Sequence, residues 1–323
     1  MPTTRRELRK SLQTNFRPGL RDRLGRGLLR ARQAINLPAL VAGGRLERPV
    51  FIVGAPRSGS SLLHSILVSS RQVGHWSGEA HEVWEAEHHP ALRDWESNVL
   101  EAADATPEVR ARIRRQFFLA TGPRRRFLEK TPRNALRIPF IEAIFPDAFF
   151  IHLKRDGRDN VNSLINAWRT PRYRTYRLPQ PHRIPGVDPN WWKFVLYPGW
   201  QEDLNGPLHL VCAKQWIVCN DRILEAEQAG GQKERWTSVR YEDLVADPVA
   251  QVSRLLDFIG LESDSEVVQA ATALATRPVN IVTPPEIGKW RRENPDEIAG
   301  ILPLIASTMQ ALGYDVRNES VSE

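Results

Sequence analysis

PVFIVGAPRSGSS, residues 49–61, joins a short apolar run to a loop of small residues. Residues 50–53 are apolar without alternation, as in a strand that is buried on both faces of a parallel sheet. The apolar segment from Ser60 to about Ser69 predicts a helix directly after the loop. A buried strand, a glycine-containing loop and a helix in this order are the setting of a phosphate-binding loop.

From Gly54 onward, the loop has the spacing G-x-x-x-x-G-K-[ST] of nucleoside triphosphatases, but Ser60 stands in the lysine position. Those enzymes need that lysine on the β- and γ-phosphates of a metal-bound nucleotide. Here the cation comes earlier, as Arg57. The backbone amides of residues 58–61 are expected to face an anion at the positive end of the following helix. The predicted anion site consists of Arg57, Ser58, Gly59, Ser60 and Ser61.

Strands and helices alternate beyond this loop. Short strands are predicted at 127–129, 149–153 and 236–240, and helices at 108–120, 134–145, 159–168, 213–229 and 249–258. The alternation predicts an α/β fold, a P-loop-like parallel sheet flanked by helices on both faces, in a single domain at 46–318. The segment 170–206 has no periodicity and is rich in Pro, Arg, Tyr and Trp, so we expect a substrate lid there. Its Trp191-Trp192 pair suits either a lid or the core.

The positive charge of the chain belongs to its first residues. The formal net charge is +7 at pH 7, whereas residues 1–44 alone hold ten Arg or Lys and two acids. The domain is therefore near neutral, and we expect no nucleic-acid binding. Leucines at four-residue steps from Leu8 to Leu28, interrupted near Pro18, predict a basic helical arm at 1–45. Packing of the arm on the domain, contact with a membrane or a partner, and a transit segment all stay open.

The sequence contains no run of eighteen apolar residues and no apolar segment directly after its basic N-terminus. We therefore expect no membrane-spanning helix and no signal peptide. Cys212 and Cys219 lie seven residues apart on a predicted helix, about 10 Å along its axis, which is too far for a disulfide. Two buried thiols suit a reducing compartment, so we expect a cytoplasmic protein, with peripheral contact to a membrane as the open alternative.

A second anion site is predicted after the strand at 149–153. Arg155 follows the carboxyl end of that strand, where ligands of open α/β sheets bind, and Ser163 lies on the next helix. An arginine with a hydroxyl suits a phosphate monoester. Arg158 is expected to form an ordinary ion pair with Asp156 or Glu142 instead. Two anion sites on one sheet imply a ligand with two separated anionic groups, such as 3′-phosphoadenosine 5′-phosphosulfate (PAPS).

Several blocks of the chain resemble the superfamily of PAPS-dependent sulfotransferases. These blocks are PRSGSSLL at 56–63, LEKTPRNALRIPFIEAIFPDAFFIHLKRDGRDNVNS at 128–163, RYEDLVADP at 240–248, RPVN at 277–280, GKW at 288–290 and LGYD at 312–315. The chain is most similar to the branch that contains bacterial sulfotransferases and protein-tyrosine sulfotransferases. The resemblance runs from about residue 50 to 315, and it implies in-line transfer of the sulfuryl group of PAPS to an acceptor hydroxyl.

The resemblance also implies roles for residues at matching positions. The loop from Arg57 to Ser61 would hold the 5′-phosphosulfate, whereas Arg155 and Ser163 would hold the 3′-phosphate. Tyr241 and Lys289 match positions that contact the nucleotide.

Sulfuryl transfer needs cations on the leaving side and a base on the acceptor side. Lys130 matches a family lysine at the transferring group, and with Arg57 it suits the leaving side. Glu79 is the predicted base, with His81 and Glu82 as alternatives, because the family places its base in this segment. Protein-tyrosine members have adjacent glutamates there, whereas this chain has Ala80 after the first.

No metal is expected. A sulfuryl group carries less charge than a phosphoryl group, so cationic side chains and loop amides can suffice. Glu85, His88 and His89 do not have the ligand spacing of the zinc families. A P-loop kinase acting on a small molecule, and a non-catalytic nucleotide-binding or membrane-associated protein, are the competing interpretations. The acceptor is left open among carbohydrate, lipid, small-metabolite and protein hydroxyls.

Overall fold

A twisted sheet of five parallel strands forms the centre of the protein, for which a computed structural model describes residues 20–123, 125–229, 233–273 and 286–316. The strands lie in the order β2–β3–β1–β4–β7. Their bounds are β2 Val73–His75, β3 Arg126–Lys130, β1 Val50–Val53, β4 Phe149–Lys154 and β7 Trp236–Arg240. The predicted parallel α/β fold is therefore confirmed, and the sequence analysis missed only the short edge strand β2.

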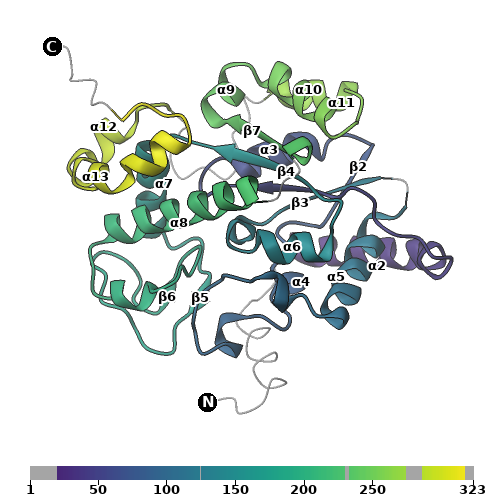
Figure 1. Cartoon of the computed structure of the whole chain (residues 1–323), viewed down its shortest axis with the longest axis horizontal. Helices are drawn as coiled ribbons and strands as arrows, with labels where there is room; N and C mark the ends of the chain where they lie inside the picture. Colours follow the sequence, from purple (N-terminus) through teal and green to yellow (C-terminus); the bar gives the residue numbers. More distant parts are fainter. Residues whose placement is uncertain (1–19, 124, 230–232, 274–285, 317–323) are drawn as a thin grey trace.

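Helices cover both faces of the sheet, so the three central strands β3, β1 and β4 are buried on both sides (Figure 1). In β1, Phe51 and Val53 belong to one apolar cluster, whereas Val50 and Ile52 belong to the other. The first face is covered mainly by α5 (Pro107–Thr121), α6 (Ile138–Ile144) and α8 (Leu208–Ala229). The second is covered by α3 (Ser60–Leu67), α9 (Tyr241–Ala246), α10 (Pro248–Phe258) and α11 (Ser265–Thr272). This double burial explains the unbroken apolar run that the sequence shows at the first strand.

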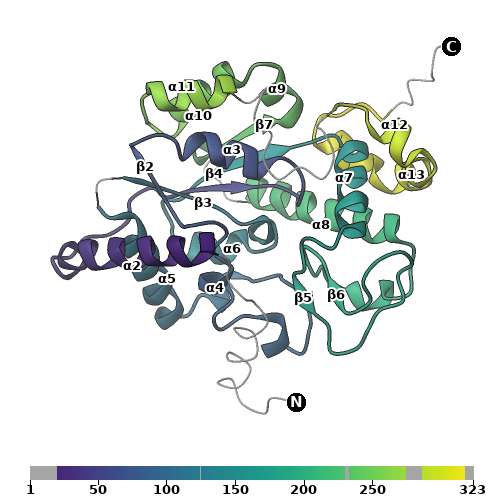
Figure 2. The same ribbon diagram turned by 180° about the vertical axis from the view of Figure 1, so that it is seen from behind.

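The remaining helices and a small ribbon extend the domain away from the sheet (Figure 2). The helices are α4 His81–Trp84, α7 Gly157–Arg169, α12 Trp290–Glu293 and α13 Pro295–Ala311. The ribbon joins β5 (Tyr176–Arg177) to β6 (Trp191–Trp192) in antiparallel pairing, inside the segment expected to be a lid. Trp192 and Trp200 are buried, so this segment contributes to the core as well as to the surface.

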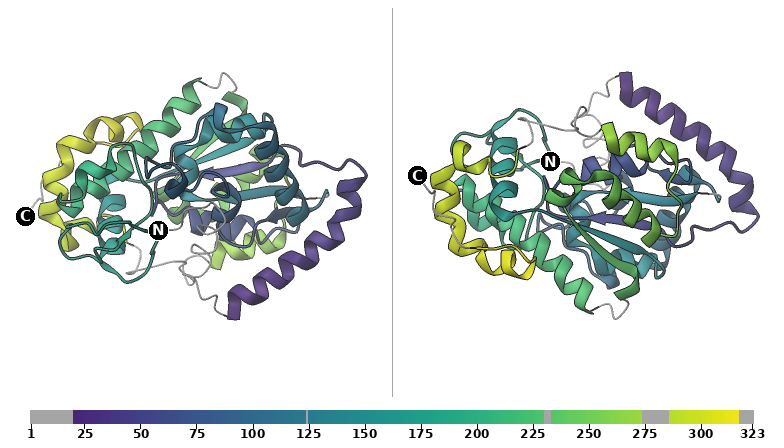
Figure 3. Two further views of the ribbon diagram at one scale, coloured as in Figure 1. Left: turned by 90° about the horizontal axis from the view of Figure 1, so that it is seen from below. Right: turned by 90° about the horizontal axis from the view of Figure 1, so that it is seen from above.

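Helix α2 (Leu20–Val41) packs along α5 at one edge of the domain (Figure 3). The Asn36 side chain donates to the Leu119 carbonyl at 2.9 Å, and Leu29 contacts the larger apolar cluster. This part of the predicted arm is thus a helix packed on the domain. The predicted apolar repeat from Leu8 to Leu28 lies outside the residues whose side chains the structure describes.

Both cysteines are buried and free, as predicted, on α8. Within the described ranges, no helix is long and apolar enough to cross a membrane.

Candidate active site

The strand order brings three separate loops together at the carboxyl end of the sheet. Strand β1 lies between β3 and β4, with Ile52 opposite Lys130 on one side and Ile151 on the other. The loop after β1 therefore has Lys130 on one flank and Arg155, which follows β4, on the other. Glu79 follows β2, which is the neighbour of β3. All of the predicted site segments that follow these strands thus converge at the edge where ligands of open α/β sheets bind.

The loop between β1 and α3 has the shape of an anion cradle. Gly59 has a φ of +104°, and a Cβ there would lie 2.5 Å from the ring of Tyr241. The first-turn amides of Ser60 and Ser61 have no partner within α3, because an α-helix leaves its first N–H groups unpaired. One detail of the prediction is wrong: the Ser58 amide donates to the Ala55 carbonyl at 3.1 Å and so closes the turn instead of facing an anion.

Two cations and a hydroxyl line one side of this loop. Arg57, with a φ of +71°, directs its Nε to the Ser163 hydroxyl at 3.4 Å. Arg155 donates to the Arg57 carbonyl at 2.9 Å and stacks on Tyr241, with its guanidinium carbon 4.3 Å from the ring centre. Burial lowers the pKa of Arg57, and the charge of Arg155 lowers it further. Two half-buried guanidinium groups whose charges oppose each other are stabilised by an anion.

The structure thus brings Arg57, Arg155, Ser163 and Tyr241 together. Lys289 is held by a different partner: its ammonium lies 3.2 Å from Glu293 on α12. The same carboxylate accepts from Asn162 on α7, at 2.9 Å, so Lys289 is tied to the helix that carries Ser163.

Buried hydrogen-bond donors that lack a partner among the described residues indicate whether this site suits PAPS. The Ser58 hydroxyl and the Arg155 Nε are both buried, and neither has a hydrogen-bond partner among the described residues. Leaving such groups unpaired costs about 1–3 kcal/mol each, so an anionic ligand would be favoured there. The loop amides, Arg57 and Arg155 therefore suit a ligand that carries phosphate and phosphosulfate groups.

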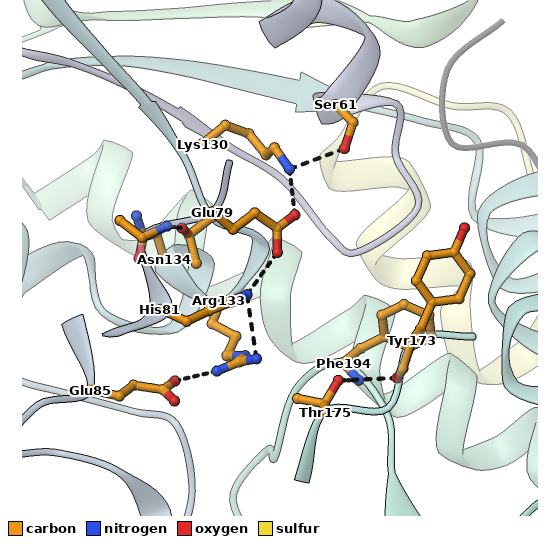
Figure 4. A network of polar contacts seen from close by, with 12 residues as sticks. Ser61, Glu79, His81, Glu85, Lys130, Arg133, Asn134, Tyr173, Thr175 and Phe194 are labelled. Atoms are coloured by element: carbon orange, nitrogen blue, oxygen red, sulfur yellow. Dashed lines mark hydrogen bonds and ion pairs between the residues drawn. The ribbon is translucent and has the colours of Figure 1, made fainter. Parts of the chain in front are cut away.

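Lys130 connects the anion loop to the predicted base (Figure 4). Its ammonium donates to the Ser61 hydroxyl at 3.0 Å and to Oε1 of Glu79. The Glu79 side chain keeps about a third of its surface exposed, whereas the Lys130 side chain is buried. Burial alone would raise the pKa of Glu79, but the hydrogen bond from His81 and the charge of Lys130 lower it well below the usual range. Glu79 is therefore a carboxylate at neutral pH, beside a cation.

The three candidate bases have different surroundings. His81 contacts the second oxygen of Glu79, with its Nε2 at 2.7 Å from Oε2. Glu82 accepts from the indole N–H of Trp76 at 3.1 Å and is not part of this chain of contacts. Of the three, only Glu79 contacts Lys130, which favours Glu79 as the base.

A buried ion-pair network lies next to Glu79 and His81 (Figure 4). Arg133 donates to Glu85 at 2.6 Å, and Arg137 and Tyr176 donate to the same carboxylate oxygen. These cations lower the pKa of Glu85 even though its burial would raise it. One oxygen of Glu85 is thus occupied by three side chains of the fold. Within the described part of the chain, no cluster of three or more metal-ligating side chains occurs.

A second buried carboxylate, Glu129, fixes the backbone near the base. Its oxygens accept from the Thr131 hydroxyl and from the Asn134 amide at 2.7 Å, and Thr131 in turn accepts from the Ala80 amide at 3.2 Å. Burial raises the pKa of Glu129 to about 7.

Sequence reasoning missed two residues of the site. Arg133 directly follows Glu129-Lys130-Thr131-Pro132, so its place in that block was the available signal. Tyr173 lies in the predicted lid, where its hydroxyl accepts from Arg57 at 3.1 Å and its ring lies under the same guanidinium. No local pattern marks Tyr173, because its contact with Arg57 spans more than a hundred residues. The predicted pairing of Arg158 with Asp156 is confirmed at 2.6 Å.

Comparisons with known proteins agree with this geometry. The model of the sulfotransferase family matches residues 49–182 and 190–265, which is more than half of the chain. Protein-tyrosine sulfotransferase A of Caenorhabditis elegans is 24% identical over 82% of this chain and 67% of its own length. Protein-tyrosine sulfotransferase of Drosophila melanogaster is also 24% identical, but the chain spans only about half of its length, 51%.

Two further matches are shorter or more distant. Carbohydrate sulfotransferase 2 of Mus musculus is 30% identical over 42% of this chain and 27% of its own length. A sulfotransferase of Mycobacterium avium has a similar fold, with a TM-score of 0.54 at 16% identity over 88% of this chain and 82% of that chain.

The chain belongs to the sulfotransferase family. The predicted membership of the sulfotransferases and the predicted P-loop-like α/β fold are thereby confirmed, and the kinase interpretation is set aside.

Proposed function

We propose that this enzyme transfers the sulfuryl group of PAPS to an acceptor hydroxyl, with Glu79 as the general base and Lys130 and Arg57 as the cations of the leaving side. The observation that supports this assignment most strongly is the position of Lys130. Its ammonium contacts both Ser61 of the anion loop and the carboxylate of Glu79. A single cation therefore lies between the group expected to hold the sulfuryl donor and the group expected to take the acceptor proton.

The donor would be held at two places. The 5′-phosphosulfate would be bound by Arg57 and the loop 58–61, where the Gly59–Ser61 amides and the Ser58 hydroxyl are the donors. The 3′-phosphate would be bound by Arg155 and Ser163, and Tyr241 would pack against the nucleotide beside Gly59. Lys289 stays a candidate nucleotide contact through its link to α7. PAPS supplies the electrophilic sulfur, and the residues of the chain supply fixed positive charge.

Glu79 suits the role of base because it is ionised and accessible. The acceptor O–H bond breaks as the new O–S bond forms, and the proton passes to the Glu79 carboxylate. The low pKa of Glu79 makes it a weak base, so the proton transfer is expected to be concerted with attack on sulfur. Fixed charges placed in advance around the reacting atoms then lower the barrier without reorganisation.

The acceptor is proposed as a hydroxyl on a protein or carbohydrate. The similar proteins above are named for protein tyrosine and for carbohydrate, and both present hydroxyl groups. Lipid and small-metabolite hydroxyls belong in the same screen, which would use radiolabelled PAPS and follow label transfer. Contact of the basic residues 1–44 with an anionic membrane, in a cytoplasmic enzyme, is a further proposal that rests on the composition of those residues alone.

The assignment of the base is tested by Glu79→Gln, with Glu82→Gln as the matched control. Loss of a general base costs about 10²–10⁴-fold in turnover, whereas the affinity for the desulfated product PAP should be retained because Glu79 does not face the nucleotide phosphates. Calorimetry with PAP and label transfer to an acceptor from the screen measure the two quantities. Full activity of Glu79→Gln, or an equal loss in Glu82→Gln, would contradict the assignment.

A further inference from the structure

The two oxygens of Glu79 have different partners, and this asymmetry needs an explanation. Oε1 contacts the Lys130 ammonium, whereas Oε2 lies 2.7 Å from Nε2 of His81. A carboxylate on a side chain with three torsions has no intrinsic preference for one orientation. The neighbouring groups therefore decide which oxygen faces the anion loop.

The surroundings of the His81 ring select one protonation state. Nδ1 is buried and has no hydrogen-bond partner in the described part of the chain, so a proton on Nδ1 would be an unpaired buried donor there. Nε2 lies beside a carboxylate oxygen, which requires a proton between them. These two constraints leave the neutral ring with its proton on Nε2.

The charged groups that act on the ring come from three segments. Glu79 lies on the loop before α4, Glu85 directly follows α4, and Arg133 lies on the segment after β3, with its Nη2 3.4 Å from Nε2. Burial and the charge of Arg133 lower the pKa of His81, and the two glutamates oppose them in part. Arg133 is fixed in turn by Glu85 and by the ring of Tyr176, 4.7 Å from its guanidinium carbon.

We propose that His81 is a positioning residue for the general base: its Nε2–H holds Oε2 of Glu79, so that Oε1 faces Lys130, Ser61 and the acceptor hydroxyl. The proposal rests on the proposed function in treating Glu79 as the base. The acceptor proton goes to Oε1, where a lone pair is left beside the Lys130 contact. His81 keeps its own proton throughout and neither gains nor loses charge. This separates its role from that of an alternative base.

The state of the ring can be measured without donor or acceptor. Nitrogen NMR of the full-length chain with ¹⁵N-labelled histidine distinguishes the two neutral tautomers and the charged ring, and His81→Gln assigns the signal. We expect the His81 ring to be neutral and protonated on Nε2 at pH 7 and above. A charged ring at pH 7, or a proton on Nδ1, would overturn the proposal. This result does not depend on whether the chain transfers sulfuryl groups.

Two amide variants then test the positioning. Gln at position 81 can place its amide N–H near the position of Nε2, whereas Asn, with similar chemistry, reaches only the position of Nδ1. The Glu79 carboxyl, followed by ¹³C NMR and assigned with Glu79→Gln, should titrate about one pH unit higher in His81→Asn than in His81→Gln, because Asn removes a hydrogen bond to the charged form. Turnover should fall about tenfold or more in Asn relative to Gln, with equal PAP affinity.

Indistinguishable carboxyl titrations in the two variants would refute the positioning role. If neither variant folds, the native His81 signal is assigned through its connection to the assigned backbone instead, and its tautomer decides. If the native chain binds PAP but transfers no label, the proposed function fails, while the tautomer and the carboxyl titration still report on His81 itself.

Discussion

Replacing Arg155 tests most directly how PAPS, the sulfuryl donor, is bound. In the structure its Nη1 donates to the Arg57 carbonyl at 2.9 Å, and its Nε is buried and has no hydrogen-bond partner among the residues that the structure describes. Arg155→Ala therefore removes a support of the anion loop and, in the complex, the charged contact to the 3′-phosphate. Adenosine 5′-phosphate lacks the 3′-phosphate, so only the first loss applies to it.

The two losses differ in size. A hydrogen bond that involves a charged group contributes about 1.5–3 kcal/mol. The bond from Arg155 to the Arg57 carbonyl is also made in the free protein, so its loss affects adenosine 5′-phosphate only through the loop, and we expect a loss of affinity of less than about tenfold, or about 1.4 kcal/mol. PAP should lose a further factor of roughly 10 to 150.

Calorimetric titration of both ligands into the native chain and the variant measures this difference directly. Arg158→Ala is the matched control, because Arg158 lies three residues away and its guanidinium is paired with Asp156 instead. It should leave both affinities nearly unchanged. An equal loss of PAP and adenosine 5′-phosphate in Arg155→Ala would refute the placement of the 3′-phosphate at Arg155.

Three further expectations follow from burial and backbone geometry. Gly59→Ala should lower the affinity for PAP, measured by calorimetry, by at least tenfold. The φ of +104° costs a non-glycine residue about 1–3 kcal/mol, and the new Cβ would meet the ring of Tyr241. Unchanged affinity would show that the loop does not need this turn. In the folded chain the pKa of Glu129 is raised to about 7, whereas a glutamate in the unfolded chain loses its proton near pH 4.3. Between these two pH values the folded chain binds one proton more than the unfolded chain, so the free energy of unfolding falls as pH rises from about 4.3 to about 7. Glu129→Gln should therefore gain up to about 3 kcal/mol relative to the native chain between pH 5 and 8 in denaturant unfolding, and a pH-independent difference would contradict this. Deleting residues 1–44 should lower the melting temperature by a few degrees, because the deletion removes the contacts of Leu29 and Asn36 with the domain. Liposome sedimentation of the same truncated protein tests the membrane proposal. That proposal fails if the truncated protein binds anionic liposomes as well as the full chain does.

The sequence by itself determined the local parts of this enzyme. The apolar run before Gly54 predicts a doubly buried strand, and the glycine spacing with Ser60 in the lysine position predicts an anion loop unlike that of a kinase. Both features depend on neighbours in the chain, so they can be read from a short window. The resemblance to sulfotransferases rests on the order of such windows along the chain.

Only the tertiary structure decided which of these parts meet. The order β2–β3–β1–β4–β7 places Lys130 and Arg155 on opposite flanks of the anion loop, and strand order depends on packing between segments far apart in sequence. For the same reason, the contacts of Glu79 with Lys130 and of Arg57 with Tyr173 could not be predicted from local pattern. The proposal of Glu79 as the base, rather than His81 or Glu82, rests on side-chain direction within one short segment: Glu79 contacts Lys130, whereas Glu82 contacts Trp76.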